Sequence, residues 1–448
     1  MKKVLFVLGL TFIAIVPLVA QPAKHVILIS IDGLRPDFYL DNKWHAPNLR
    51  KLKNAGVYAK GIKSVFPSVT YPAHTTIITG AYPARHGVYY NAPIDANPGQ
   101  WYWEESYIKT PTLWDAVKEA GLTSAAVMWP VTVGAPIDFN FPVRRADEDE
   151  KADQLTVTLP YVTPRGLMDE IQQHATGKLT PEDFSSEYTI DKTIGQMGAY
   201  IFKTYKPNLM ALHFITLDHM QHEEGREGPS IEKSVALIDS MVGVVVKTVA
   251  DAGLQTSTAI IITGDHGFVN SIRMFSPNVL LEQQGLLSKD SWSARFHAVG
   301  GAAFLYLKDK NDTKTLKKIK RLLALLPPDH QAGYRLVGRA ELDKVGANPE
   351  VILGLAMKEG YAVNNNQQGV ILKEIKKGGS HGYFPDFNQI HTGFIAAGAG
   401  IGSKKVVGEM GIKDIAPLVS SLLGLSFKAP DGVLVPHILS NNQKQSGK

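Results

Sequence analysis

The chain has no cysteine in 448 residues, which excludes disulfide bonds and thiol catalysis. A strong charge of one sign is also absent, because 47 Lys and Arg against 42 Asp and Glu leave a formal net charge of +5. No basic block with interleaved aromatic residues occurs, so duplex nucleic acid is not indicated as a partner. Repeats and disorder-prone composition are missing too, and the length suffices for a large α/β domain with an insertion.

The first twenty residues have the pattern of a targeting segment. Lys2 and Lys3 precede an apolar run that ends in the small residue Ala20, which predicts a signal peptide over residues 1–20 with cleavage before Gln21. An uncleaved membrane anchor is the alternative, although the run is at the short end for spanning a bilayer. The lack of cysteine near the junction excludes a lipoprotein signal. We expect a periplasmic or secreted protein without a stable membrane anchor.

Strand-like and helix-like segments alternate along the rest of the chain. This alternation is typical of an α/β, doubly wound sheet with helices on both faces. Two stretches interrupt it. The charged run that begins at Arg144 is interpreted as a solvated surface, and residues 268–379 are interpreted as an inserted, cap-like subdomain. The expected division is therefore a catalytic domain over residues 21–267, the insertion, and the end of the catalytic domain over residues 380–448.

Three apolar runs are each followed by a carboxylate. Asp32 follows one run, Asp218 and His222 follow the second, and Asp265 and His266 follow the third. Parallel strands place their ligand sites at their carboxyl ends, so these side chains are expected at one edge of the sheet. Carboxylate oxygen with imidazole nitrogen suits zinc, and two sets of about three ligands with open positions indicate a hydrolytic two-metal site. For a single Asp, capping of the next helix is the alternative.

Thr70 is the candidate nucleophile. It precedes Tyr71 and Pro72 and a helix-like stretch, which predicts an N-cap position with proline in the first turn. The positive helix end and its N–H groups form a ready site for phosphate oxygens, and coordination to zinc is one way to activate a hydroxyl. The alternative is that Thr70 only caps the helix.

Six segments, in this order, resemble the nucleotide pyrophosphatase/phosphodiesterases of the alkaline phosphatase superfamily. They are Ile31–Phe38, Phe66–Val88, Asn91, Asp218–His222, Gly264–Gly267 and Ser380–Gly398. The resemblance covers most of the mature chain. It implies an alkaline-phosphatase-like fold, two Zn²⁺ ions and a threonine nucleophile.

Individual roles follow from the resemblance by position. One zinc takes Asp218, His222 and His381, and the other takes Asp32, Asp265, His266 and the oxygen of Thr70. Asn91 helps to hold a phosphoryl oxygen, and Tyr71 is one wall of a slot for a nucleobase. His213 occupies the position of the second wall, where the family often has tyrosine, and this departure leaves nucleotide recognition open.

The resulting hypothesis is a type I phosphodiesterase or nucleotide pyrophosphatase. It would hydrolyse small-molecule diesters or nucleotides through a covalent phosphothreonine. A phosphomonoesterase of the same fold is an alternative, but it needs a cationic partner for the extra charged oxygen, whereas Asn91 is neutral and Ala92 and Pro93 follow it. A non-catalytic zinc-binding protein of the same fold is the other alternative.

Overall fold

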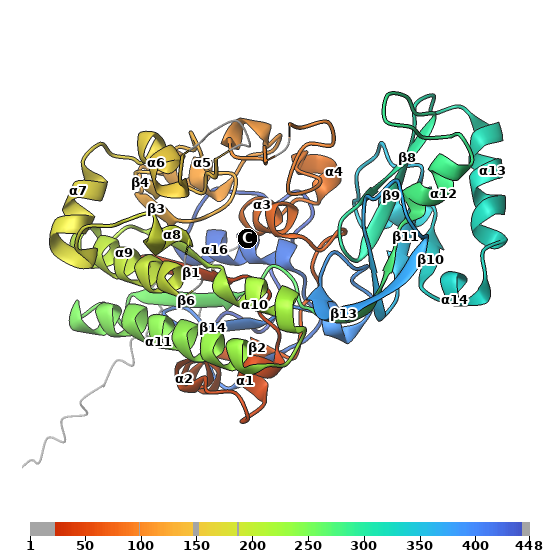
Figure 1. Cartoon of the computed structure of the whole chain (residues 1–448). Coiled ribbons are helices and arrows are strands. Elements are labelled where there is room, and N and C mark those ends of the chain that lie inside the picture. Colours follow the sequence, from red (N-terminus) through yellow and green to blue (C-terminus); the bar gives the residue numbers. More distant parts are fainter. Residues whose placement is uncertain (1–22, 98, 147–151, 186–187, 441–448) are drawn as a thin grey trace, which may run out of the picture.

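The computed structural model describes residues 23–97, 99–146, 152–185 and 188–440, so the predicted signal peptide lies outside the described residues. Its main sheet has eight strands in the order β15-β2-β14-β6-β1-β5-β3-β4 (Figure 1). These strands are β1 (His25–Ile31), β2 (Val57–Ala59), β3 (Ser124–Val127), β4 (Phe139–Phe141), β5 (Leu209–Phe214), β6 (Thr258–Thr263), β14 (Phe394–Gly398) and β15 (Lys405–Val407).

Parallel pairing dominates the middle of this sheet. Strand β1 pairs in parallel with β5 and with β6, β3 pairs in parallel with β5 and β4, and β14 runs antiparallel to β6. Every residue of β1, β5 and β6 is buried. This burial explains the apolar runs in the sequence, because a strand covered on both faces has no side that faces solvent.

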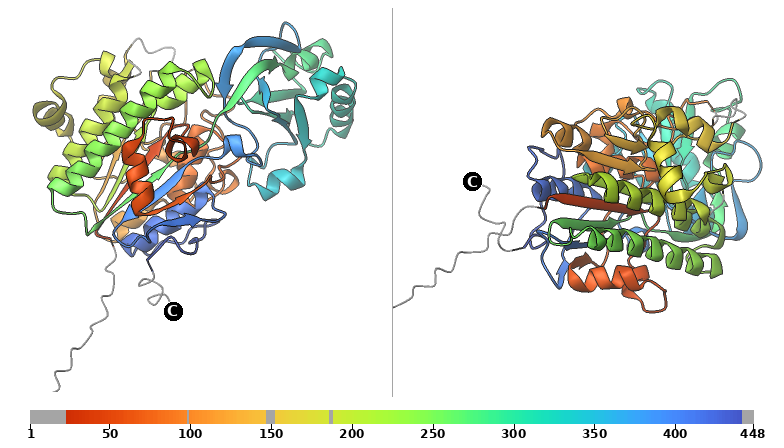
Figure 2. Two further views of the ribbon diagram at one scale, coloured as in Figure 1. Left: turned by 90° about the horizontal axis from the view of Figure 1, so that it is seen from below. Right: turned by 90° about the vertical axis from the view of Figure 1, so that its left-hand side faces the viewer.

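Helices cover both faces of the sheet (Figure 2). Ile27 and Ile29 of β1 pack in a core with α2, α9 and α11, whereas Val26 and Leu28 pack in a second core with α3, α5 and α16. The helices of this part are α1 (Asp37–Leu40), α2 (Pro47–Ala55), α3 (Thr70–Thr79), α4 (Pro83–His86), α5 (Leu113–Glu119), α6 (Gln154–Thr158), α7 (Leu167–Ile171), α8 (Glu182–Ser185), α9 (Thr189–Tyr205), α10 (Thr216–Glu224), α11 (Pro229–Asp251) and α16 (Ile415–Leu423). The doubly wound α/β prediction is confirmed.

The segment between β6 and β14 builds two smaller sheets beside the main one (Figure 1). One has the order β10-β11-β9-β8, the other has the order β12-β7-β13, and they enclose a hydrophobic core of their own. Their elements are β7 (Val269–Phe275), α12 (Pro277–Gln283), β8 (Ala294–Ala298), β9 (Ala302–Leu307), α13 (Thr313–Ala324), α14 (Pro328–Gln331), β10 (Tyr334–Val337), α15 (Arg339–Lys344), β11 (Leu353–Met357), β12 (Gly360–Val363) and β13 (Leu372–Ser380). The boundaries 268 and 379 stay a prediction. Across the described ranges, no helix is both long and apolar enough to cross a bilayer.

Candidate active site

Three carboxylates meet at the carboxyl edge of the main sheet. Asp32 directly follows β1, Asp265 lies two residues beyond β6, and Asp218 lies in the first turn of α10 after β5. Because β1 pairs with both β5 and β6, the three strand ends are neighbours. The sequence-based prediction of a shared edge is confirmed.

One group of possible metal ligands consists of Asp32, Asp265 and His266. All three are buried, and their ligand atoms lie within 4.8 Å of one another. His266 Nε2 is 3.3 Å from Asp32 Oδ1 and 3.1 Å from Asp265 Oδ2. Buried groups of this composition can hold a zinc ion.

A second group gathers around Asp218. His222 Nε2 lies 3.5 Å from Asp218 Oδ2, one helical turn away, and His381 Nε2 lies 3.6 Å from Asp218 Oδ1. His266 Nε2 is also 3.9 Å from Asp218 Oδ1, so His266 lies between the two groups. His381 directly follows strand β13 and is far along the chain from Asp218 and His222. No local spacing in the sequence could therefore identify it.

The three histidines of these groups share one orientation. Nδ1 of each faces a backbone carbonyl: Gly379 for His222 at 3.2 Å, Gly267 for His266 at 3.1 Å, and Ser68 for His381 at 3.1 Å. A carbonyl only accepts, so Nδ1 carries a proton, and Nε2 is the nitrogen that faces the carboxylates and can bind a cation. Metal-binding histidines are commonly held by such contacts.

Four of the possible ligand atoms have no hydrogen-bond partner among the described residues. Within the described part of the chain, Asp32 Oδ1, Asp218 Oδ1, Asp265 Oδ2 and His266 Nε2 are buried without a hydrogen bond. Burial, then Asp265 and Asp218, raise the pKa of Asp32 well above its usual value, and burial, then His266, lower the pKa of His381. Buried polar atoms without partners are costly, and a divalent cation among them would satisfy all four.

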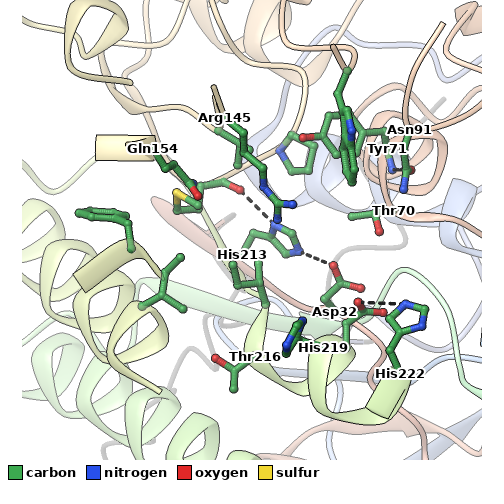
Figure 3. A pocket seen from close by; sticks show the side chains of 18 of the residues that line it. Asp32, Thr70, Tyr71, Asn91, Arg145, Gln154, His213, Thr216, His219 and His222 are labelled. Carbon is green, nitrogen blue, oxygen red and sulfur yellow. Dashed lines mark hydrogen bonds and ion pairs between the residues drawn. The ribbon is translucent and has the colours of Figure 1, made fainter. Parts of the chain in front are cut away.

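Thr70 begins helix α3 rather than capping it. The N-cap residue is Val69, and no side chain caps the helix, which corrects the predicted N-cap position of Thr70 by one residue. The Thr70 hydroxyl therefore makes no capping hydrogen bond. Thr70 is 8 % exposed and lines the same cavity as Asp32 and Asp218, as Figure 3 shows for the labelled residues.

Asn91 is fixed to the start of the same helix. Its Oδ1 accepts a hydrogen bond from the backbone N–H of Tyr71 at 3.0 Å. The acceptor end of the amide is thereby occupied, which leaves its NH₂ group to donate to a substrate oxygen. The Tyr71 ring meets the Trp101 ring edge-on at 5.1 Å between centroids, and both line the cavity.

His213 lines the larger cavity, and both of its ring nitrogens have partners. The ring is 3 % exposed, its Nδ1 contacts Met128 O at 3.0 Å, and its Nε2 lies 3.3 Å from Asp32 Oδ2 (Figure 3). The carbonyl that holds it belongs to a non-glycine residue in the left-handed region, with φ of 59°. Such strain is often found at functional sites. These contacts favour a role in holding Asp32, and the role of His213 as a base-stacking wall stays a prediction.

Two hollows adjoin the ligand groups. The larger, of about 610 Å³, includes Thr70, Tyr71 and Asp32 in its lining. The smaller, of about 330 Å³, lies toward the inserted segment, where Val299 and Gly300 contribute to it. Both hollows are lined by Asn91, Trp101, His222 and His381.

Comparison with known proteins decides the family. The family model described as type I phosphodiesterase / nucleotide pyrophosphatase matches residues 26–384. The chain belongs to this family of hydrolases. It is 23 % identical over 425 residues to bis(5'-adenosyl)-triphosphatase of Mus musculus, covering 92 % of this chain and 80 % of that one. It is 25 % identical over 427 residues to ectonucleotide pyrophosphatase/phosphodiesterase family member 5 of Homo sapiens, covering 92 % and 77 %.

Solved structures show the same fold. Human ectonucleotide pyrophosphatase / phosphodiesterase 5 superposes with a TM-score of 0.65 at 21 % identity, covering 92 % of this chain and 97 % of that one. The murine protein, in an inactive threonine-to-alanine variant in complex with AMP, gives 0.64 at 21 % identity with 93 % and 97 % coverage.

Several residues of the larger hollow in this family member were missed by the sequence analysis, among them Trp101, Arg145 and Gln154. Arg145 is exposed, as expected for the charged run that begins at Arg144, and it also lines that hollow, whereas residues 147–151 of the run lie outside the described residues. Arg145 follows β4, the outer parallel strand, so the rule of strand carboxyl ends applies to it as well. This rule could have indicated Arg145 from the sequence. Strand β4 is only three residues long, however, and so short a strand gives a weak pattern in the sequence.

Proposed function

We propose that this chain is a zinc-dependent hydrolase of phosphodiesters and pyrophosphates that acts on nucleotides or related diesters. Thr70 would be the nucleophile, and a phosphothreonine would be the covalent intermediate. The observation that carries the proposal is the pair of hollows that meet at Asn91 and His381, because a diester has two substituents to accommodate.

Two zinc ions suit the donor set. Asp218, His222 and His381 would hold one, and Asp32, Asp265 and His266 with the Thr70 oxygen would hold the other. Support comes from the four buried ligand atoms without partners and from the Nε2 atoms that the Nδ1 contacts turn inward. When bound, zinc supplies Lewis-acid stabilisation of phosphoryl oxygens and lowers the pKa of a coordinated hydroxyl.

The covalent chemistry falls to Thr70. Its Oγ attacks phosphorus, the Oγ–P bond forms, and the bond to the leaving oxygen breaks, with the hydroxyl proton passing finally to that leaving group. Water then cleaves the Oγ–P bond, which releases the monoester and restores the hydroxyl. The NH₂ group of Asn91, held through Tyr71, would donate to a non-bridging oxygen on which charge accumulates.

The nucleotide part of the proposal rests on aromatic side chains and on relatives. Tyr71 and Trp101 give the larger hollow an aromatic wall, which suits a nucleobase. A murine relative was solved with AMP, and a curated relative is named for a bis-adenosyl triphosphate. We also propose export to the periplasm or secretion, supported by the predicted signal peptide and the ectonucleotide name of the human relative.

A comparison of ester types tests the proposal. Purified enzyme should give a higher kcat/KM for bis(p-nitrophenyl) phosphate or a nucleotide p-nitrophenyl diester than for p-nitrophenyl phosphate, since the leaving group is the same. Equal or reversed efficiencies would assign the chain to the phosphomonoesterase alternative. The cation at Arg145 is the observation that keeps this alternative open.

A further inference from the structure

Arg145 is the cationic side chain that lines the larger hollow. Its guanidinium carbon lies 5.1 Å from the centre of the Trp101 ring, and Trp101 in turn packs against Tyr71. A guanidinium stacked on an aromatic ring keeps its planar edge available for hydrogen bonding. The stack therefore holds a positive charge on the same wall as the residue that follows the nucleophile (Figure 3).

Gln154, the first residue of α6, supplies a second donor. It lines the same hollow, and its side-chain Nε2 is buried without a hydrogen-bond partner among the described residues. A buried amide NH₂ without a partner costs free energy unless a ligand satisfies it. The guanidinium of Arg145 and the Nε2 group of Gln154 thus offer donors to this hollow, a combination suited to an oxygen-rich acceptor.

Apolar side chains also contribute to this hollow. Val143, Phe184 and Ile190 line it, which suits the body of an organic substituent rather than a free phosphate ion. Thr70 also lines this hollow, whereas the lining of the smaller hollow does not include it. In-line displacement sends the leaving group away from the attacking oxygen, so the group beside Thr70 is the one that the enzyme retains.

We infer that Arg145 and Gln154 form a subsite for a second anionic group, a phosphate or a carboxylate, carried by the retained substituent of the diester. The inference rests on the proposed function and names its substrate class. A planar guanidinium binds such oxygens in a bidentate manner, and a charge-assisted hydrogen bond of this kind discriminates strongly against a neutral group.

The test uses two chromogenic diesters with one leaving group. They are p-nitrophenyl thymidine 5'-phosphate and the same compound with a 3'-phosphate. We expect kcat/KM of the wild-type enzyme to be about tenfold higher for the doubly charged compound, and Arg145→Gln to bring the ratio close to one. Arg145→Lys should restore part of the ratio. Arg165→Gln, which removes an equal charge at an exposed site, should keep the wild-type ratio.

Direct binding of product analogues, measured by titration calorimetry, gives a second readout that needs no turnover. Thymidine 3',5'-bisphosphate should bind about tenfold more tightly than thymidine 5'-monophosphate, and Arg145→Gln should remove this difference. A wild-type ratio of one, a ratio that survives Arg145→Gln, or an equal loss for both diesters would overturn the subsite. Absence of diester turnover in the wild type would instead reject the proposed function, and the binding titration separates that outcome from failure of the subsite.

Discussion

The side-chain oxygen of Asn91 accepts the backbone N–H of Tyr71 at 3.0 Å, which ties the proposed oxyanion donor to the residue after the nucleophile. Asn91→Asp keeps this acceptor but replaces the NH₂ donor by a negatively charged oxygen. We expect kcat/KM for diesters to fall by about 100- to 1,000-fold. The melting temperature should stay close to that of the wild type, because the contact with Tyr71 is kept. Single-turnover kinetics and calorimetry check both parts, and an activity near the wild type would remove Asn91 from the chemistry.

The Thr70 hydroxyl caps no helix, so its removal should spare the fold. Thr70→Ala should reduce turnover by about a thousandfold or more while zinc binding stays measurable. Thr70→Ser should keep part of the turnover, since a primary alkoxide can do the same chemistry. Rapid acid quenching followed by mass spectrometry should find the phosphoryl group with its retained substituent on residue 70 of the wild type and of Thr70→Ser, but not of Thr70→Ala. Near-normal turnover in the alanine variant would make water the attacking group.

Metal removal should abolish activity, because every proposed ligand acts as a deprotonated oxygen or a neutral nitrogen. Chelator treatment should stop diester hydrolysis, zinc should restore it, and elemental analysis should find two equivalents. His266→Ala should lower the zinc content, since His266 Nε2 faces carboxylates of both groups. His45→Ala, at an exposed position, is the matched control. A fully active preparation without a divalent transition metal would contradict the mechanism.

Gly300 lies in the inserted segment, next to Ser380 and His381 at the end of strand β13. Its φ is +75°, and a Cβ there would meet Ser380 Oγ at 2.5 Å and His381 O at 2.7 Å. Gly300→Ala should therefore displace His381 and weaken zinc binding. Gly285→Ala separates strain from contact, because its φ is +65° but nothing lies within 4 Å of the added carbon. It should cost about 1 kcal/mol of unfolding free energy without a change in zinc affinity. Equal zinc affinities in both variants would refute the proposed displacement.

Acid should destabilise the fold through His86. Burial lowers the pKa of this histidine to about 3, and its Nδ1 accepts the N–H of Val88. Above its ordinary pKa of about 6.5 both states are neutral. Below that pH only the unfolded chain takes up the proton, so His86 should lower the free energy of unfolding by about 1.4 kcal/mol per pH unit down to about pH 3.

The check is a comparison of slopes. His86→Asn keeps an acceptor for Val88 but does not titrate, so its urea midpoint should fall less steeply than that of the wild type between about pH 6.5 and pH 5. Other histidines titrate alike in both proteins and cancel in the difference. Parallel slopes would mean that His86 accepts its proton in the folded state.

The sequence by itself determined the carboxylate positions. Asp32, Asp218 and Asp265 each follow a predominantly apolar run, and such runs are strands covered on both faces, whose carboxyl ends share one edge. The doubly wound class followed from the same runs. The sequence also predicted His222, because it lies four positions after Asp218 and a helix brings residues at this spacing onto one face.

Only the tertiary structure decided how distant residues meet. His381 reaches Asp218 across more than 150 residues because β13 returns to the edge of the main sheet, and Nδ1 contacts with Ser68 and Gly379 turn His381 and His222 inward. Arg145 is exposed, as its charged run predicts, but it also lines the larger hollow, and a charged run carries no periodicity that tells a cavity wall from open solvent. Local sequence encodes strands and helices through short-range sterics and burial, whereas cavity walls depend on how loops from separate strands pack, which no local pattern specifies.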